Sequence, residues 1–227
     1  MSTKLKVAFL MDPLEKLDLK GDTSFALALE AQERGHTIHH FTPDALILKS
    51  NKVLANICKF ELNIENGFNN YKYYEKNIQL LSDFDIVLMR QDPPFDMSYI
   101  TATHLLEKLP KKTIVVNNPF EVRNAPEKIF VTNFPHLMPD TLITKDINVI
   151  KSFRDEFQDI IIKPLYGNGG QGVFHLKPND ENFYSILEMF FKQSNEPLMI
   201  QKYLKDVRNG DKRIILLNGE VVGALNR

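Results

Sequence analysis

The chain has no excess of charge of either sign: 28 lysines and arginines stand against 29 aspartates and glutamates in 227 residues. Proteins that bind nucleic acids usually carry a basic excess, so this balance argues against such a partner. No apolar run approaches the ~18 residues of a membrane-spanning helix. The first apolar stretch runs into Asp12 and Pro13 without a small-residue cleavage site, which indicates a first strand and not a signal peptide. These absences predict a cytoplasmic protein with no nucleic-acid or membrane partner.

Cysteine is almost absent, and the single Cys58 cannot form an intramolecular disulfide. It lies in an alternating apolar stretch, which favours a buried strand thiol over a nucleophile, because the sequence places no base nearby. The histidines form neither a HExxH motif nor a Cys/His cluster, and neighbours His39 and His40 would point to opposite faces of a strand. A zinc site is therefore disfavoured.

The composition is that of a globular protein, with 43% hydrophobic and 25% charged residues. In the N-terminal half, short apolar runs alternate with helical segments, a pattern typical of a parallel sheet flanked by helices. We expect strands at 5–11, 36–41, 85–89 and 113–117, helices at 22–34 and 98–109, and a hairpin at 46–64 that turns at Ser50 and Asn51. The aromatic, amide-rich segment 66–77 is interpreted as a surface loop or irregular helix. Residues 1–122 are thus predicted to form one α/β domain with a mainly parallel sheet.

The second half has a different pattern, in which strands follow one another directly across a glycine-rich loop. We expect helices at about 125–133, 146–157 and 181–193, and strands near 141–144, 159–163, 172–177, 198–203 and 212–217. This pattern predicts an antiparallel α+β domain over 123–227, with the seam at the Asn117-Asn118-Pro119 turn.

The glycine-rich loop carries the strongest chemical signal. Gly167, Gly169 and Gly172 match G-x-G-x-x-G, but here the motif separates two strands, whereas a dinucleotide fingerprint opens a helix. A Walker A motif is excluded because no Lys-Ser/Thr follows. Backbone amides of such a loop can approach phosphate oxygens, and Lys163 precedes it as a fixed positive charge. A mobile glycine hairpin is the alternative, but four glycines in six residues exceed what a tight turn needs, which favours phosphate binding.

Two further cations have ordinary explanations when each is taken alone. Lys128 lies on a predicted helix, where a lysine is most often solvated, and Arg213 begins an apolar strand, where a charge is common. Their order in the chain is informative: Lys128, then Lys163 with the glycine loop, then an apolar strand at 198–204, then GDKRIILLNGE at 210–220. This order resembles that of ATP-grasp ligases.

Three longer segments narrow the resemblance. MDPLEKLDLKGDTSFALALEAQERGH at 11–36, LMRQDPPFD at 88–96 and VNNPFEVRNAPEKIF at 116–130 resemble the bacterial glutathione synthetase family. The resemblance implies a pre-ATP-grasp, Rossmann-like first domain followed by an ATP-grasp domain. It also implies that ATP phosphorylates the carboxylate of γ-glutamylcysteine, after which glycine displaces the phosphate. The implied cofactors are ATP and Mg²⁺, with Mn²⁺ as an alternative, and the implied assembly is a homo-oligomer.

The resemblance also assigns roles to individual residues. Lys128 and Lys163 would hold ATP phosphates, and Arg213 would stabilise the acyl phosphate as the catalytic residue. The remaining ATP-binding positions are Gly167, Asn168, Gly169, Gly170, Gln171, Gly172, Gln201, Tyr203, Leu204 and Asp211. The substrate-binding positions are Asp12, Ser24, Arg90 and Arg227. The turn at Asp92-Pro93-Pro94 has an alternative explanation, because proline alone makes a turn rigid.

The sequence differs from the family pattern in its magnesium ligands. Magnesium ligands of ATP-grasp enzymes come from strands beyond the point where this chain stops, so we expect no metal ligands here and an incomplete second domain. Two alternative functions remain at this stage: another ATP-grasp carboxylate–amine ligase, or a nucleotide-binding module without catalysis.

Overall fold

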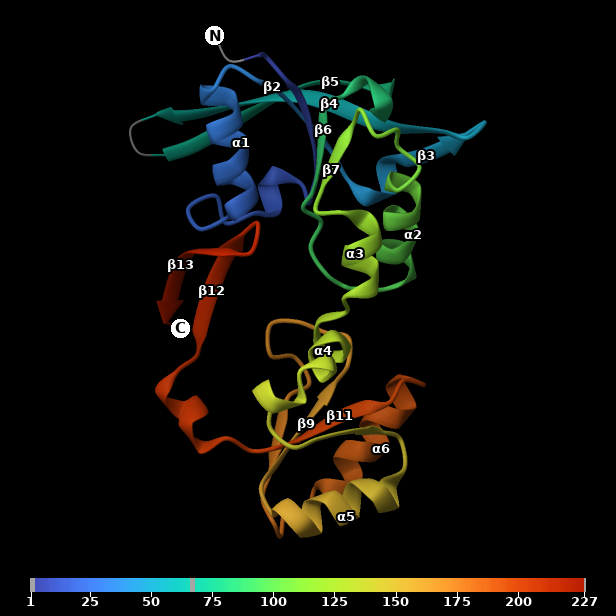
Figure 1. Cartoon of the computed structure of the whole chain (residues 1–227), viewed down its shortest axis with the longest axis vertical. Helices are drawn as coiled ribbons and strands as arrows, with labels where there is room; N and C mark the ends of the chain where they lie inside the picture. The colour runs from blue at the N-terminus through green and yellow to red at the C-terminus, as the bar shows by residue number, and fades with distance from the viewer. Residues whose placement is uncertain (1–2, 66–67, 227) are drawn as a thin grey trace. The chain divides into compact units, whose positions relative to one another are not determined.

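A computed structural model describes residues 3–65 and 68–226 and divides the chain into two compact units, Met1–Phe130 and Val131–Arg227 (Figure 1). No helix among the described residues is both long and apolar enough to cross a membrane. Short 3-10 segments occur at Leu14–Lys16, Pro43–Ala45, Leu81–Asp83, Val131–Asn133, Pro135–Leu137 and Lys205–Asn209.

The first unit is built on one mixed sheet with the strand order β3-β4-β2-β1-β6-β7, in which β5 pairs with β4. Its parallel strands are β1 (Lys6–Leu10), β2 (Thr37–Phe41), β6 (Ile86–Met89) and β7 (Ile114–Val116). Its antiparallel strands are β3 (Leu46–Lys49), β4 (Lys52–Glu65) and β5 (Phe68–Leu80). The four expected strands and the expected hairpin are all confirmed, and the hairpin turns at Ser50 and Asn51, which both have positive φ.

The helices of this unit begin where the sequence supplies caps. In α1 (Thr23–Glu33), the Asp22 carboxylate accepts a 2.7 Å hydrogen bond from the Phe25 N–H. In α2 (Met97–Leu106), Asp96 accepts one of 2.9 Å from Tyr99 N–H. Two shorter helices follow. The sequence did not predict α3 (Pro119–Asn124), and the helix predicted over 125–133 is divided into α4 (Glu127–Phe130) and the 3-10 segment Val131–Asn133.

Side chains of the central strands alternate between two hydrophobic clusters, one on each face of the sheet. Ala8 and Leu10 belong to one cluster, and Val7 and Phe9 belong to the other. The buried histidines follow this alternation: the His39 ring packs against Phe84, and the His40 ring packs against Phe60 and Tyr73. The predicted opposite orientation of these two rings is confirmed, as is the burial of Cys58.

The prediction for 66–77 is wrong over its described part, because residues from Phe68 onward form strand β5. Among the described strands, β5 pairs only with β4. Most of its exposed positions carry polar residues, which the sequence pattern assigned to a loop. Tyr71 and Tyr73 pack against the cluster around Phe9, which is the period-two signal of a strand. The Tyr73 hydroxyl also accepts a 3.1 Å hydrogen bond from Leu14 N–H.

The second unit contains a four-stranded antiparallel sheet with the order β10-β9-β11-β8. Its strands are β8 (Thr141–Thr144), β9 (Ile160–Pro164), β10 (Phe174–Leu176) and β11 (Leu198–Lys202), and its helices are α5 (Ile147–Phe157) and α6 (Phe183–Gln193). A separate hairpin follows, β12 (Lys212–Leu217) with β13 (Glu220–Asn226). The predicted antiparallel α+β arrangement is confirmed.

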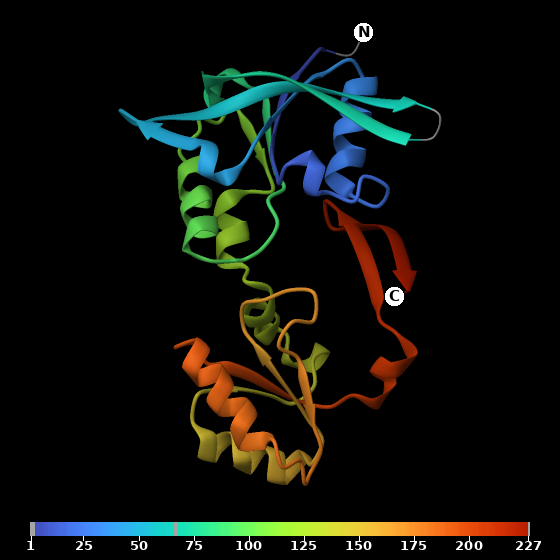
Figure 2. The same cartoon turned by 180° about the vertical axis from the view of Figure 1, so that it is seen from behind.

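Both helices of the second unit pack on the same face of the four-stranded sheet (Figure 2). Ile160, Ile162 and Ile200 contribute to the cluster on this face, together with Ile150 of α5 and Leu187 of α6. Strand residues between these positions therefore point to the opposite face, where neither helix packs.

Candidate functional site

The opposite face of the four-stranded sheet forms a cavity of about 520 Å³. Cavities that bind small molecules typically measure ~300–1,000 Å³. The lining residues come from β9, β10, β11, the segment after β11 and the residues shortly before β8 and β10. They are Pro139, Ile161, Lys163, Val173, His175, Gln201, Lys202, Tyr203, Leu204, Val207 and Arg208. Four residues that the sequence predicted for ATP therefore meet in one cavity: Lys163, Gln201, Tyr203 and Leu204.

Strand register explains why these side chains meet. Ile161 pairs with both His175 and Gln201 across the sheet, so the three side chains share one face. Lys163 lies two residues further along β9 and shares that face as well. The Gln201 amide donates a 2.8 Å hydrogen bond to Thr141 Oγ1 of β8, which fixes its orientation in the cavity wall.

The charges of the cavity suit an anion. Its described lining includes Lys163, Lys202 and Arg208 and no carboxylate. Lys202 Nζ lies 3.9 Å from Asp140 Oδ2, an exposed ion pair that neutralises little of this charge. A concave surface lined by cations concentrates anionic ligands such as a polyphosphate.

Tyr203, the first residue after β11, makes three contacts that fix the position of its ring. Its ring stacks on the His175 ring with centroids 3.9 Å apart and an interplanar angle of 19°. Its N–H donates to the Asp159 carbonyl oxygen at 3.0 Å, and its hydroxyl accepts from Arg208 Nε at 2.9 Å. One wall of the cavity is thus an ordered aromatic surface.

The glycine-rich loop joins β9 to β10, so it separates two strands as the sequence predicted. Positive φ at Gly169, Gly170 and Gly172 gives the loop a course that other residues rarely adopt. A Cβ on Gly172 would lie 3.1 Å from Pro164 Cδ and 3.3 Å from Phe190 Cε1, whereas Gly169 and Gly170 face open space. The loop is therefore packed at its base and uncrowded at its tip, where Asn168 lies exposed.

The remaining predicted ATP-site residues lie elsewhere in the chain. Lys128 is half-buried in α4 of the first unit. Asp211 and Arg213 are exposed, Asp211 just before β12 and Arg213 within it. Gly167, Gln171 and Gly172 line a second cavity of about 230 Å³ at the loop base. Arg227 lies outside the described residues.

In the first unit, three predicted substrate-binding residues lie where the parallel strands end. Asp12 follows β1 and Arg90 follows β6, so both lie at the carboxyl edge of the sheet, where α/β proteins bind ligands. Arg90 Nε donates a 3.1 Å hydrogen bond to Oγ of Ser24, which is only 4% exposed near the start of α1. The structure brings Ser24 and Arg90 into direct contact.

An acidic pair completes this edge. The Asp92 N–H donates to Asp12 Oδ2 at 3.4 Å. Desolvation raises the pKa of Asp92, and the nearby Asp12 and Asp22 carboxylates raise it further, while Arg90 opposes them. Next to it, Gln91 is buried, and its Oε1 accepts no hydrogen bond from the residues that the structure describes. The edge thus combines a guanidinium with carboxylates, groups that can bind an amino acid backbone.

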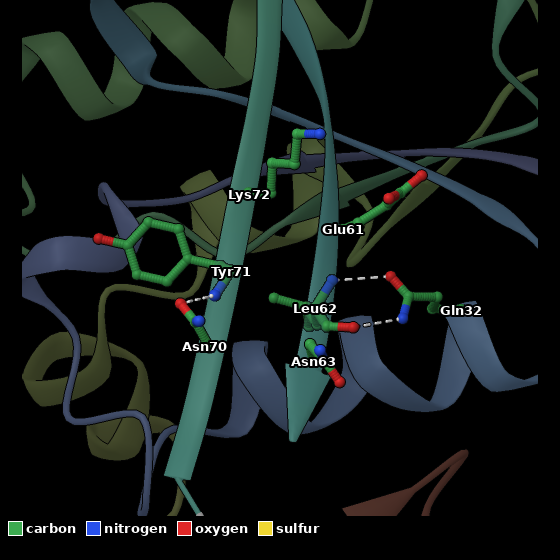
Figure 3. A pocket seen from close by; sticks show the side chains of 7 residues that line it. All are labelled: Gln32, Glu61, Leu62, Asn63, Asn70, Tyr71 and Lys72. Atoms are coloured by element: carbon green, nitrogen blue, oxygen red, sulfur yellow. Dashed lines mark hydrogen bonds between the residues drawn. The ribbon is translucent and has the colours of Figure 1, made fainter. Parts of the chain in front are cut away.

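A third depression, of about 380 Å³, lies between α1 and the β4–β5 hairpin (Figure 3). Here the Gln32 side chain reaches Leu62 of β4 and pairs with its main chain. The Gln32 amide donates to Leu62 O at 2.7 Å, and Gln32 Oε1 accepts from Leu62 N–H at 2.8 Å. The side chain therefore substitutes for a neighbouring strand.

Sequence reasoning missed three polar residues of the large cavity: His175, Lys202 and Arg208. His175 shares the period-two face of Ile161, a signal that was available once the strands were assigned. Arg208 lies in a 3-10 segment, and no periodic pattern indicates that it reaches Tyr203.

Two family models match the chain. The N-terminal domain of prokaryotic glutathione synthetase matches residues 5–123, and the ATP-grasp domain of the same family matches residues 127–227. Among curated relatives, glutathione synthetase of Mesorhizobium japonicum is 58% identical over 224 residues, which cover 99% of this chain and 71% of that protein. Glutathione synthetase of Brucella melitensis is 57% identical, covering 98% of this chain and 71% of that protein.

Solved structures show the same fold at low sequence identity. A RimK domain ATP-grasp protein from Sphaerobacter thermophilus has a TM-score of 0.65 at 17% identity, covering 98% of this chain and 72% of that one. D-cycloserine synthetase DcsG has a TM-score of 0.62 at 15% identity, with 96% and 66% covered. A mixed, mainly parallel sheet domain followed by an ATP-grasp-like domain is thereby shown.

Proposed function

The chain belongs to the prokaryotic glutathione synthetase family of ATP-grasp ligases, and from this premise we propose that the cavity on the open face of the four-stranded sheet is its ATP site. The observation that carries the proposal is the meeting of Lys163, Gln201, Tyr203 and Leu204 in one cation-lined cavity. The main chain of residues 203 and 204 would read the edge of the adenine base. Lys163, at the end of β9, would contact phosphate oxygens.

We propose γ-glutamylcysteine and glycine as the substrates. In the first step, the carboxylate of γ-glutamylcysteine attacks the γ-phosphorus of ATP, forming an acyl phosphate and releasing ADP. In the second step, the glycine amine attacks the acyl carbon, loses a proton and expels phosphate. Phosphoryl transfer needs alignment and charge stabilisation more than a covalent nucleophile, which agrees with a site built from cations.

Individual roles are proposed from the resemblance to the family. Lys128 and Lys163 would bind phosphates, and amides from Gly167 to Gly172 would cover the γ-phosphate as a small lid. Arg213 would stabilise the acyl phosphate as the catalytic residue, with Asp211 beside it, and Arg227 would add a cation near the substrate. The packed base and uncrowded tip of the loop fit a segment that changes position around a ligand.

The carboxyl edge of the first sheet is our candidate for binding the peptide substrate. Arg90 would pair with a substrate carboxylate, and Ser24 orients its guanidinium through the 3.1 Å hydrogen bond. Asp12 would accept hydrogen bonds from a substrate ammonium group. Self-association into a homo-oligomer is a further proposal from the family likeness, and light scattering would test it.

Mg²⁺ or Mn²⁺ bound to ATP would neutralise phosphate charge. Within residues 3–65 and 68–226, no group of three His, Cys, Asp or Glu residues could hold a metal ion. None of the steps above is therefore assigned to a metal ligand among these residues.

Calorimetric titration of ATP into Lys163→Ala tests the ATP site. Loss of one charged hydrogen bond costs ~1.5–3 kcal/mol, so we expect ATP affinity to fall about 10- to 160-fold. Lys177→Ala is the matched control, because this exposed lysine follows β10 and does not line the cavity. Equal ATP affinity in the two variants would contradict the assignment.

A further inference from the structure

His175 lines the cavity, yet the proposed reaction gives it no role. It is the central residue of β10, and its side chain is 23% exposed, so it is accessible to a ligand but restrained by neighbours. Its partner across β9 is Ile161, which places the imidazole on the cavity face of the sheet. A polar ring at this position requires an explanation.

The His175 ring is fixed by two contacts. One face stacks on Tyr203, with ring centroids 3.9 Å apart. Its Nε2 lies 3.3 Å from Asp159 Oδ1, and because a carboxylate only accepts hydrogen bonds, Nε2–H is the donor. Asp159 therefore orients the imidazole against the tyrosine.

The same aspartate also holds Tyr203 directly, since the Asp159 carbonyl accepts from the Tyr203 N–H at 3.0 Å. Arg208 Nε donates to the tyrosine hydroxyl at 2.9 Å. Contacts from the start of β9, from β10 and from the 3-10 segment thus converge on the first residue after β11. Of these contacts, only the His175 stack acts on the face of the tyrosine ring.

We propose that His175 is a positioning residue for ATP: by stacking on Tyr203 it holds the aromatic wall of the base pocket in its binding orientation before the nucleotide arrives. This inference rests on the proposed ATP site. Its physical basis is preorganisation, because a wall that is already ordered loses less conformational entropy when the ligand binds. Asp159 serves the same purpose indirectly by orienting the imidazole.

The test compares ATP dissociation constants, measured by calorimetric titration, for the native protein and three variants. His175→Ala removes the stack and the hydrogen bond, His175→Gln removes only the ring, and His175→Phe retains only the ring. Stacked ring pairs contribute ~0.5–1.5 kcal/mol, so we expect His175→Ala and His175→Gln to bind ATP about 2- to 10-fold more weakly. His175→Phe should bind ATP more tightly than both.

A readout specific to positioning comes from steady-state kinetics. The KM for ATP should rise in His175→Ala, while the KM for γ-glutamylcysteine and kcat stay close to native, because the stack lies at the base end of the site. A general loss of structure would move all three values. Tyr184→Ala serves as the matched control: it removes an exposed ring of the same unit that does not line the cavity.

Native ATP affinity in His175→Ala would overturn the inference, and so would a His175→Phe variant as weak as His175→Ala. Failure of the proposed function gives a different result: Lys163→Ala would then bind ATP as well as the native protein does. The two ideas can therefore fail separately.

Discussion

Replacing Gln32 by leucine should weaken the first unit at a defined place. The Gln32 side chain forms hydrogen bonds with both the carbonyl oxygen and the N–H of Leu62, at 2.7 and 2.8 Å (Figure 3). Leu62 is only 5% exposed. Leucine has a similar volume, but it supplies neither the donor nor the acceptor. The substitution therefore leaves an N–H and a C=O at the edge of β4 without their present partner.

The expected loss of stability in Gln32→Leu follows from these two hydrogen bonds. Each contributes ~1 kcal/mol net, and a buried group left unpaired costs ~1–3 kcal/mol. The depression beside Leu62 admits water, which favours the lower values, so we expect a loss of about 2 kcal/mol in the free energy of unfolding. Gln32→Glu keeps an acceptor for the Leu62 N–H but places a carboxylate oxygen opposite the Leu62 carbonyl oxygen, so it should not recover the lost stability.

The assay is amide hydrogen exchange at Leu62 together with urea unfolding. With a urea slope of ~1–3 kcal/mol per M, a loss of 2 kcal/mol lowers the midpoint by roughly 1 M. Glu30→Leu on the same helix is the control, because the Glu30 side chain is exposed and forms a surface ion pair with Arg34. If Gln32→Leu keeps the Leu62 amide protected and stays within about 0.5 kcal/mol of the control, the reasoning is refuted.

Three further predictions concern the loop, the catalytic arginine and acid stability. In a binding titration, Gly172→Ala should reduce ATP affinity more than Gly169→Ala. Both glycines have positive φ, but of these two positions only 172 would bring an added Cβ close to Pro164 and Phe190. Equal losses of affinity would contradict this prediction. Arg213→Ala should lower kcat more than ATP affinity, because its proposed partner forms only with the acyl phosphate, and equal losses would indicate a ground-state role. Burial, helped by Lys6, lowers the pKa of His39 to about 4, so protonation opposes folding. The free energy of unfolding should fall by up to ~3 kcal/mol as the pH drops from 6.5 to 4. In His39→Leu, urea unfolding at a series of pH values should show a smaller dependence of this free energy on pH. An unchanged pH dependence would show that other groups cause it.

Much of the fold could be predicted from the sequence because local signals and tertiary packing agree. Asp22 and Asp96 cap the helices that were expected after them, and Ser50 with Asn51 form the expected turn. The failure at β5 has a physical cause: an edge strand with exposed polar positions lacks the continuous apolar pattern of a central strand. Only the spacing of Tyr71 and Tyr73 carried the strand signal.

The candidate site was predictable in part. Lys163 and the glycine loop are adjacent in the sequence, and their residue types alone predict phosphate binding. The contact of Tyr203 with His175 and Arg208 was not predictable, because it depends on the register of β9 and β10 and on the path of a 3-10 segment. The hydrogen bond between Ser24 and Arg90 likewise joins residues far apart in the chain.

The most direct test of the account is ADP release from ATP in the presence of γ-glutamylcysteine and glycine, measured beside reactions in which D-alanine or glutamate replaces glycine. We predict ADP release that requires both γ-glutamylcysteine and glycine, that yields one glutathione per ADP, and that is lost in Lys163→Ala. Release that is independent of γ-glutamylcysteine, or greater with another acceptor than with glycine, would contradict the assignment.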